Sequence, residues 1–267
     1  MSSQVSHFTL ATANTHFADM IRASDGLKPL QGVDILTFQE VIDREGYNLE
    51  AILAQAGFTL IHVATRFGLA IAIRSNLKLK FVPGSMREYR LQKMGLVERR
   101  LVQRSAKPSQ PQQYTERGLI AAKFVMQNGQ ELIVATTHPV VPIMPHARRA
   151  QIIRIGQLLD ESYFDGQLIL SGDMNHYPKP RPIDKKMRHE ARLLAVDLNN
   201  EPTWYARGSK QEKYLQLVAY LQRRQIEDFN GQHDTILYRG GKIKPVSVKV
   251  ADIVSDHRAI IARFSLE

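Results

Sequence analysis

The residues of this sequence that could carry chemistry stand at the ends of short apolar runs or directly before them. In chain order they are Asn14, Glu40, His138, Asp173, Asn175, Asp234, Asp256 and His257. A β-strand holds its terminal residue rigidly, and residues at one end of neighbouring strands can converge on one site. Carboxylate and amide oxygens are the ligands that Mg²⁺ prefers, and one or two carboxylates typically hold the ion together with phosphate oxygens. The histidines would then transfer protons and stabilise charge, oriented by neighbouring aspartates.

Each of these residues also has an ordinary structural interpretation. Asp173 and Asn175 could form a turn after a strand, because both residue types tolerate turn geometry. His257 could be a structural histidine bonded to Asp234, and Asn14 could cap a following helix. The complete set in this order favours the chemical interpretation of Asp173 and His257, and it leaves both interpretations of Asn14 open.

The elements that must position these residues are short strands alternating with helices. Strands are expected at residues 8–13, 34–38, 58–64, 69–74, 77–82, 119–126, 131–137, 166–170, 235–238, 246–250 and 259–264. Helices are expected at residues 16–23, 47–56, 147–159, 185–197 and 210–224. Asn128-Gly129 between two apolar runs is a strong hairpin signal. The pattern predicts one α/β domain over residues 1–267, without a linker.

Composition narrows the chemistry and the class of partner. Lys and Arg outnumber Asp and Glu by 36 to 26, and the net charge of +10 favours nucleic acid, an anionic membrane surface or a phosphorylated small molecule. The absence of cysteine excludes disulfides, thiolate metal sites and a cysteine nucleophile. We expect a cytoplasmic protein, because the first residues lack a signal-peptide pattern and no apolar stretch approaches the ~20 residues that span a bilayer.

Positive charge gathers in two stretches. Residues 83–116 lack clean periodicity and are expected to be an irregular insertion that carries Arg87, Arg90, Lys93, Arg99, Arg100, Arg104 and Lys107. The second stretch contains Lys179, Arg181, Lys185, Lys186 and Arg188. Such charge is most often a solvated surface. However, one stretch precedes Arg117 and the other follows Asn175, so we expect both to rim the mouth of one site.

Eight short motifs carry a resemblance to a known family. They are Leu10-Ala11-Thr12-Ala13-Asn14, Asp34-Ile35-Leu36-Thr37-Phe38-Gln39-Glu40, Glu116-Arg117-Gly118, Thr136-Thr137-His138, Gly172-Asp173-Met174-Asn175, Pro202-Thr203-Trp204, His233-Asp234-Thr235-Ile236-Leu237 and Ser255-Asp256-His257. In this order they resemble the endonuclease/exonuclease/phosphatase superfamily, which has the deoxyribonuclease-I-like fold. Gly-Asp-x-Asn and Ser-Asp-His are the specific elements. The sequence departs from the family at Ala13, where a Trp is usual.

The resemblance implies both a fold and a metal site. The implied fold is a four-layer α/β sandwich, in which two packed, mostly antiparallel or mixed sheets are flanked by helices. The implied activity is that of a metal-dependent phosphoesterase. Glu40 would hold Mg²⁺, with Mn²⁺ as the alternative ion, and Asp256 would complete its shell directly or through water. Asn14 is expected to contact the metal, the phosphate or both.

The resemblance also implies roles for the remaining site residues. Asp173, with Asn175, would position and help deprotonate the attacking water. His257, oriented by Asp234, would act as a general base or as a hydrogen-bond donor to the phosphate. Further hydrogen-bond donors to the phosphate would be His138, Asn14 and Arg117. They would stabilise the charge that develops in the transition state.

The expected substrate is nucleic acid, either DNA or RNA, bound to a monomer through the basic rim. The alternative is a phosphatase or phospholipase-type esterase acting on a phosphoinositide, a sphingomyelin-like lipid or a small phosphorylated metabolite, with a membrane lipid as partner. A third interpretation is a non-catalytic binding module on the same fold. Repair of abasic sites is not expected, since those relatives usually have a tyrosine in place of His138. The sequence leaves open whether cleavage is internal or terminal.

Overall fold

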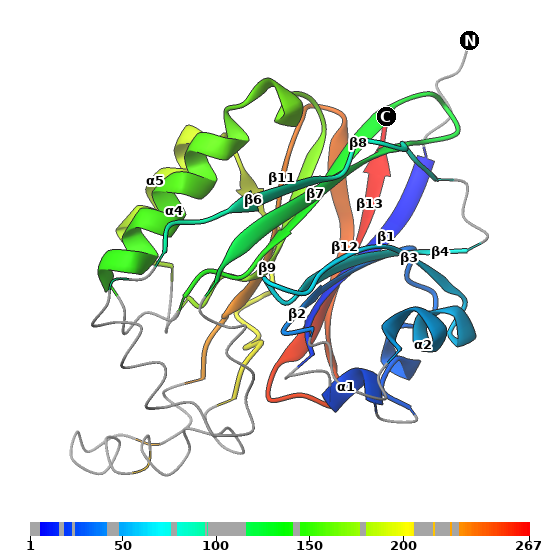
Figure 1. Ribbon diagram of the computed structural model, residues 1–267, viewed down its shortest axis with the longest axis horizontal. Coiled ribbons are helices and arrows are strands. Elements are labelled where there is room, and N and C mark those ends of the chain that lie inside the picture. The colour runs from blue at the N-terminus through cyan, green and yellow to red at the C-terminus, as the bar shows by residue number, and fades with distance from the viewer. Residues whose placement is uncertain are drawn as a thin grey trace.

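Thirteen β-strands and the helices around them make up the part of the chain that this computed structural model describes (Figure 1). The described residues are 6–15, 19–22, 25–41, 48–75, 79–93, 95, 116–140, 145–176, 180–205, 216, 225 and 230–267. The strands form two sheets, which lie face to face.

The first sheet contains strands from both ends of the chain. In spatial order it consists of β12 (Ile243–Asp252), β13 (Arg258–Leu266), β1 (Ser6–Asn14), β2 (Ile35–Gln39), β4 (Leu69–Arg74) and β3 (Phe58–Ala64). β1 and β2 are parallel, and the other neighbours are antiparallel.

The second sheet comes from the middle of the chain. In spatial order it consists of β10 (Leu194–Ala195), β11 (Asp234–Arg239), β9 (Leu168–Asp173), β8 (Glu131–Thr137), β7 (Gly118–Val125) and β5 (Lys80–Phe81), and β6 (Arg87–Arg90) also pairs with β7. Here β8 and β9 form the parallel pair. Gly129, at φ 81, lies in the turn of the expected β7–β8 hairpin.

Helices cover the outer face of each sheet and complete four layers (Figure 1). The first sheet carries α1 (Asp19–Arg22), η1 (Lys28–Leu30) and α2 (Leu49–Gln55), whereas the second carries α4 (Pro145–Leu159), η3 (Ser162–Phe164) and α5 (Pro182–Glu190). Three separate apolar clusters fill the space between the sheets and the space under each helical layer. The expected α/β sandwich is confirmed.

The two parallel pairs bring the ends of four strands to one end of the molecule. Asn14 pairs with Gln39 at the end of β1 and β2, so Glu40 follows directly. Thr136 pairs with Ser171 near the end of β8 and β9, two residues before His138 and Asp173 respectively. Because the carboxyl ends of parallel strands meet at one edge, each sheet delivers part of a candidate site there.

Two expectations about secondary structure are wrong. The helix expected at residues 185–197 begins earlier and ends at Glu190, where Arg192 takes a positive φ of 54° and Leu194–Ala195 form β10 instead. The segment 83–116 is not irregular throughout, because Arg87–Arg90 form β6 against β7. Residues 96–115 and nearly all of the helix expected at 210–224 lie outside the described residues.

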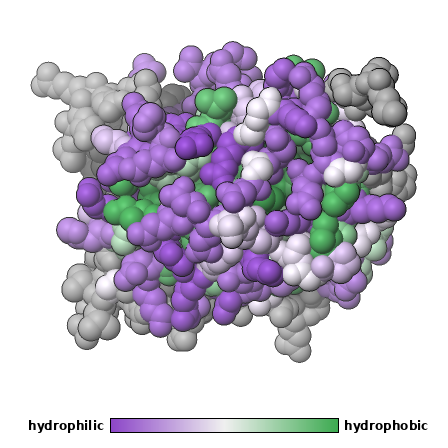
Figure 2. Space-filling model, turned by 90° about the horizontal axis from the view of Figure 1, so that it is seen from above, coloured by the Kyte–Doolittle hydropathy of each residue, from purple (hydrophilic) through white to green (hydrophobic). Residues whose placement is uncertain are grey.

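The surface view shows no large apolar area. Hydrophilic side chains cover most of the face in Figure 2, and apolar side chains appear in small, separate areas. Large exposed apolar residues among the described ones are Ile153, Leu194, Tyr205, Val246 and Val254. Such scattered residues are normal on a protein surface. None of the described helices is long and apolar enough to cross a membrane.

Candidate active site

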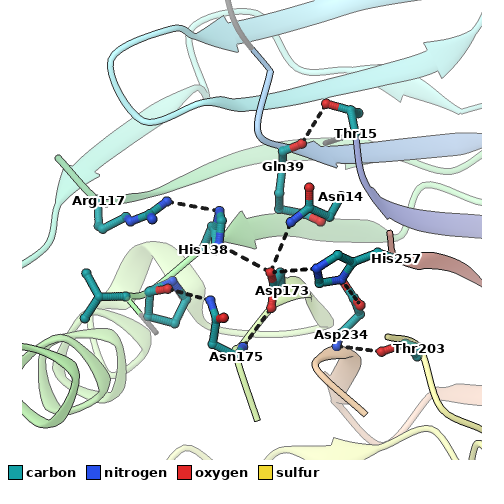
Figure 3. A network of polar contacts seen from close by, with 12 residues as sticks. Asn14, Thr15, Gln39, Arg117, His138, Asp173, Asn175, Thr203, Asp234 and His257 are labelled. Atoms are coloured by element: carbon teal, nitrogen blue, oxygen red, sulfur yellow. Dashed lines mark hydrogen bonds and ion pairs between the residues drawn. The ribbon is translucent and has the colours of Figure 1, made fainter. Parts of the chain in front are cut away.

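One carboxylate oxygen lies at the centre of the candidate site (Figure 3). Oδ2 of Asp173 accepts a hydrogen bond from Asn14 Nδ2 at 3.1 Å. It also lies 3.3 Å from His138 Nε2 and 3.7 Å from His257 Nε2. Asp173 is 2 % exposed. Three nitrogen atoms from distant parts of the chain thus surround a single buried oxygen.

His257 lies between two carboxylates. Its Nδ1 is 2.8 Å from Oδ2 of Asp234, while its Nε2 faces Asp173. Asp234 in turn uses its backbone N–H to donate to Thr203 Oγ1 at 3.0 Å. Since β11 is antiparallel to β9, Asp234 pairs directly with Asp173, and this register sets the two carboxylates side by side.

Burial and neighbouring charges shift the titration of this group. Burial alone would lower the pKa of His257, but the carboxylates of Asp234 and Asp173 outweigh it and raise that pKa to about 10. Burial likewise favours a raised pKa for Asp173, yet the imidazoles of His257 and His138 hold it well below the usual range. Burial and the adjacent Asp173 raise the pKa of Asp234. His257 is therefore an imidazolium in this arrangement.

The turn after β9 is shaped around Asp173 and Asn175. The Asn175 backbone N–H donates to Asp173 Oδ1 at 2.8 Å, and its side-chain Nδ2 donates to the carbonyl of Pro139 at 3.0 Å. Asn175 takes a positive φ of 51°, a conformation that Asn tolerates better than most residues. Gly172 is required by close packing, because a Cβ there would lie 2.0 Å from the carbonyl oxygen of Thr137.

The contact with Arg117 favours one tautomer of His138. Arg117 Nη1 lies 3.1 Å from His138 Nδ1, and a guanidinium can only donate. Nδ1 of His138 therefore accepts, and the ring proton sits on Nε2, which faces Asp173. Arg117 precedes Gly118, where a Cβ would meet the Phe67 ring at 2.2 Å. The Arg-Gly pair in the sequence thus allows β7 to approach the β3–β4 turn.

Glu40 and Asp256 lie at the same end of the first sheet as Asn14. Glu40 follows Gln39, the pairing partner of Asn14, and takes a positive φ of 57°. Ser255 Oγ donates to the Asn14 carbonyl at 2.9 Å, which holds the turn containing Asp256 against the end of β1. The Asp256 carboxylate is close enough to contribute to the raised pKa of His257. These three residues offer the oxygen atoms that suit a hard divalent cation.

A second group of buried residues also offers possible metal-ligand atoms, but its histidine is protonated when no metal is bound. Asp173, Asp234 and His257 place possible ligand atoms within 4.8 Å of one another. However, a histidine ligand binds metal through a deprotonated nitrogen. Both ring nitrogens of His257 face carboxylates, which raise its pKa to about 10 and so favour the doubly protonated ring when no cation is bound. The oxygen groups of Glu40, Asn14 and Asp256 therefore fit a cation better than the buried Asp-Asp-His group does.

His233 packs against His257 and carries Trp204 on its other side. Trp204 stacks on His233 with ring centroids 4.7 Å apart, and His233 meets His257 edge to face at 5.9 Å. Burial lowers the pKa of His233 to about 3, so this imidazole is neutral. His233 was not among the residues predicted for the site. Its position directly before Asp234 was the available signal for a place beside the site.

The comparisons with known proteins define the class of enzyme. The model of the Endonuclease/Exonuclease/phosphatase family matches residues 9–257, and the chain therefore belongs to that family. Its members hydrolyse phosphoester bonds and depend on divalent metal ions, so this chain is a phosphoesterase. A search of curated sequences finds no match.

Solved structures support the same fold at low sequence identity. The human Nocturnin catalytic domain with bound sulfate has a TM-score of 0.65 at 17 % identity, covering 99 % of this chain and 98 % of that one. D. rerio TDP2, complexed with a single-strand DNA product, has a TM-score of 0.65 at 16 % identity and 97 % and 99 % coverage. The inositol polyphosphate 5-phosphatase domain of SPsynaptojanin, with inositol (1,4)-bisphosphate and calcium, has a TM-score of 0.60 at 16 % identity and 98 % and 85 % coverage.

Proposed function

We propose that this phosphoesterase is a divalent-cation-dependent phosphodiesterase that cleaves nucleic acid. The observation that carries the chemistry is the convergence of Asn14, His138 and His257 on one oxygen of Asp173. These nitrogen atoms are preorganised hydrogen-bond donors, and they could also donate to an anionic phosphate bound next to Asp173. The ionised carboxylate of Asp173 beside that phosphate can accept a hydrogen bond from the attacking water.

Asp173 is proposed to position the attacking water by accepting a hydrogen bond from it. Its lowered pKa keeps it ionised, and an ionised carboxylate can accept a hydrogen bond from water. Asn175 holds the other carboxylate oxygen through its backbone N–H, which fixes the direction in which the free lone pairs point. The left-handed turn at Asn175 thus contributes to orientation.

His257 is proposed to donate a hydrogen bond to the phosphate as an imidazolium. The pKa of about 10 means that it carries a proton on both nitrogens at neutral pH, which favours the donor role over that of general base. Asp234 orients the ring through Nδ1. His138, Asn14 and Arg117 supply further donors to the charge that develops during hydrolysis.

Glu40, Asp256 and the side-chain oxygen of Asn14 are proposed to hold the cation. Mg²⁺ is the expected ion, and Mn²⁺ is the alternative. A cation bound there would polarise a phosphoryl oxygen and stabilise the leaving oxygen. Asn14 would then belong to both halves of the site, because its Nδ2 already donates to Asp173.

Charge supports nucleic acid as the substrate. The net charge of +10 attracts polyphosphate, and binding through phosphate contacts weakens steeply as salt rises. β6 brings part of the basic segment to the site, because Leu91 N–H donates to the Arg117 carbonyl and the exposed Lys93 follows. Some of this charge is internally neutralised, since Arg90 pairs with Glu116.

A hydrolysis panel tests the proposal. The wild-type protein with Mg²⁺ or Mn²⁺ is compared on single- and double-stranded DNA, RNA, an abasic duplex, a phosphoinositide and sphingomyelin. Cleavage of DNA or RNA that requires the cation and falls with rising salt supports it. Turnover confined to the phosphoinositide or sphingomyelin would replace it with the lipid-esterase alternative, and no metal-dependent turnover of any substrate would favour a binding module.

A further inference from the structure

The residues that fill the space between the two sheets change from apolar to polar toward the active site. Inward-facing residues in the middle of the strands are apolar and completely buried: Leu10, Ile35, Val134 and Ile169. Two residues further along each strand the inward-facing residues are polar, although they are equally buried: Thr12, Thr37, Thr136 and Ser171. Gln39 is also 0 % exposed and lies beside Thr12. We call these five residues the polar layer.

Hydrogen bonds of the polar layer cross from one sheet to the other. Thr37 Oγ1 on β2 lies 2.8 Å from Ser171 Oγ on β9. Gln39 Nε2 donates to Thr136 Oγ1 on β8 at 2.9 Å, and also to Thr12 Oγ1 in its own sheet at 3.1 Å. None of these atoms is among the buried polar atoms that lack a partner in the described structure.

The candidate active site is divided between the same two sheets. The first sheet and its connections supply Asn14, Glu40, Asp256 and His257, whereas the second supplies Arg117, His138, Asp173, Asn175 and Asp234. The contacts of Asp173 with Asn14 and His257 therefore depend on how one sheet lies over the other. A purely apolar interface would leave that offset to packing alone.

We propose that the polar layer fixes the offset between the sheets and thereby aligns the two halves of the active site. Thr37, Ser171, Gln39 and Thr136 would act as positioning residues, since complete burial keeps them from touching substrate. Hydrogen bonds are directional, whereas apolar contacts tolerate sliding. The layer lies directly beneath the site, because Thr12, Thr136 and Ser171 are each two residues before a site residue on the same strand face.

Energetics favour a positioning role over a stabilising one. Replacing both partners of a buried hydrogen bond by apolar groups of similar shape can be nearly neutral for stability. Chemistry is far less tolerant, because a misplacement of ~1 Å can reduce turnover ~100-fold. A variant that loses the cross-sheet bond should therefore lose turnover while it keeps its fold.

The test removes the Thr37–Ser171 cross-sheet bond completely, together with the contacts of these two hydroxyls with the carbonyls of Ala11 and Ala135. In the variant Thr37→Val/Ser171→Ala both hydroxyls are lost and shape is nearly kept. The assay uses bis(p-nitrophenyl) phosphate, a simple phosphodiester, so that the result does not depend on nucleic acid being the substrate. We expect kcat to fall by roughly 10- to 100-fold with KM changed less than threefold, and Thr37→Ser to retain wild-type kcat.

A matched control removes a Thr–Ser hydrogen bond of the same kind outside the polar layer. Thr59 Oγ1 and Ser75 Oγ form a 3.0 Å hydrogen bond on the exposed surface of the first sheet. Thr59→Val/Ser75→Ala should leave kcat unchanged. Equal losses in both double variants, or wild-type kcat in Thr37→Val/Ser171→Ala, would overturn the proposal.

A second measurement does not require turnover. Imidazole ¹⁵N resonances report the contacts of His257 and His138 in the folded protein. His257 reaches Asp173 and Asp234 across the two sheets, whereas His138 follows a strand of the same sheet as Asp173. The resonances of His257 should shift more than those of His138 in Thr37→Val/Ser171→Ala, and neither should shift in the control. Unchanged His257 resonances in a folded Thr37→Val/Ser171→Ala variant would contradict the proposal even without an assay.

Discussion

Asp173 and Asp234 face each other across an antiparallel strand pair, and His257 bridges the two carboxylates. Two buried carboxylates side by side would repel each other if both were ionised. The imidazolium of His257 offsets that repulsion, and its own pKa rises to about 10 as a result. The pair of aspartates and the histidine therefore behave as one electrostatic unit.

Replacing Asp234 by Asn should damage catalysis more than folding. The substitution keeps the shape but removes the charge that holds Nδ1 of His257. We expect kcat to fall roughly 10²–10⁴-fold, in line with other histidines that lose their orienting aspartate. Phosphodiester hydrolysis and circular dichroism measure the two effects.

The control for this substitution is Asp252→Asn. Asp252 is an exposed aspartate whose carboxylate accepts from Arg258 Nε at 2.7 Å. An exposed pair of this kind contributes about 0–1 kcal/mol, so the variant should match wild type in both measurements. Equal activity of Asp234→Asn and Asp252→Asn would show that the buried pair has no catalytic role.

Replacing Asp173 by Asn should lower the pKa of His257. Of the two carboxylates that raise this pKa, Asp173 is the one that faces Nε2. In the wild type the imidazolium should persist through neutral pH and titrate near pH 10. The variant should titrate at lower pH, and turnover should fall by at least ~10³-fold because the proposed water acceptor is lost. NMR titration of the imidazole measures the shift, and an unchanged pKa would argue against the electrostatic unit.

Removal of divalent cations should abolish hydrolysis, and Mg²⁺ or Mn²⁺ should restore it. Glu40→Gln and Asp256→Asn should each raise the cation concentration needed for half-maximal activity by ~10- to 100-fold, since each removes a proposed charged oxygen ligand. Glu50→Gln, which changes an exposed residue of α2, should not affect the requirement. Identical metal dependence in all three variants would remove Glu40 and Asp256 from the cation site.

Stability at acid pH should depend on Asp184, a buried carboxylate that pairs with Arg148. Arg148 Nη2 donates to Asp184 Oδ1 at 2.7 Å, and both side chains are almost completely buried. Burial favours a raised pKa for Asp184, but His176 and Arg148 outweigh it and lower that pKa. A lowered folded-state pKa contributes stability above the ordinary value near 3.8, and this contribution is lost as pH falls through the folded-state pKa.

Asp184→Asn should therefore cost about 3–5 kcal/mol at neutral pH, because it leaves the buried Arg148 charge unpaired. The difference from wild type should shrink as pH falls, which urea unfolding at a series of pH values would measure. Glu161→Gln, which changes an exposed partner of Arg154, serves as the control. Parallel stability curves for wild type and Asp184→Asn would contradict the assignment.

The strand ends were the most predictable part of the structure. Phe58–Ala64 and Leu69–Arg74 form strands with the expected bounds. The convergence of Asn14, His138 and Asp173 follows from the positions where β1, β8 and β9 end. It also requires the parallel pairing of β1 with β2 and of β8 with β9.

Other features depend on contacts between residues far apart in the chain. Arg87–Arg90 form a strand because β7 offers them an edge, although their own sequence shows no clean period. The hydroxyls of Thr37 and Ser171 are 134 residues apart, and nothing local marks them as partners. Their shared signal is a polar residue at an inward position, which becomes visible only when the sheets are placed face to face.

The β7–β8 turn at residues 127–130 has a practical consequence. β8 runs from this turn to His138, and its seven residues place the turn about 23 Å from the catalytic end. A fluorescent label or a short immobilisation peptide inserted between Asn128 and Gly129 would leave the approach of a long polymer to the opposite end unobstructed. The fold therefore offers an attachment point for single-molecule observation of the enzyme at work.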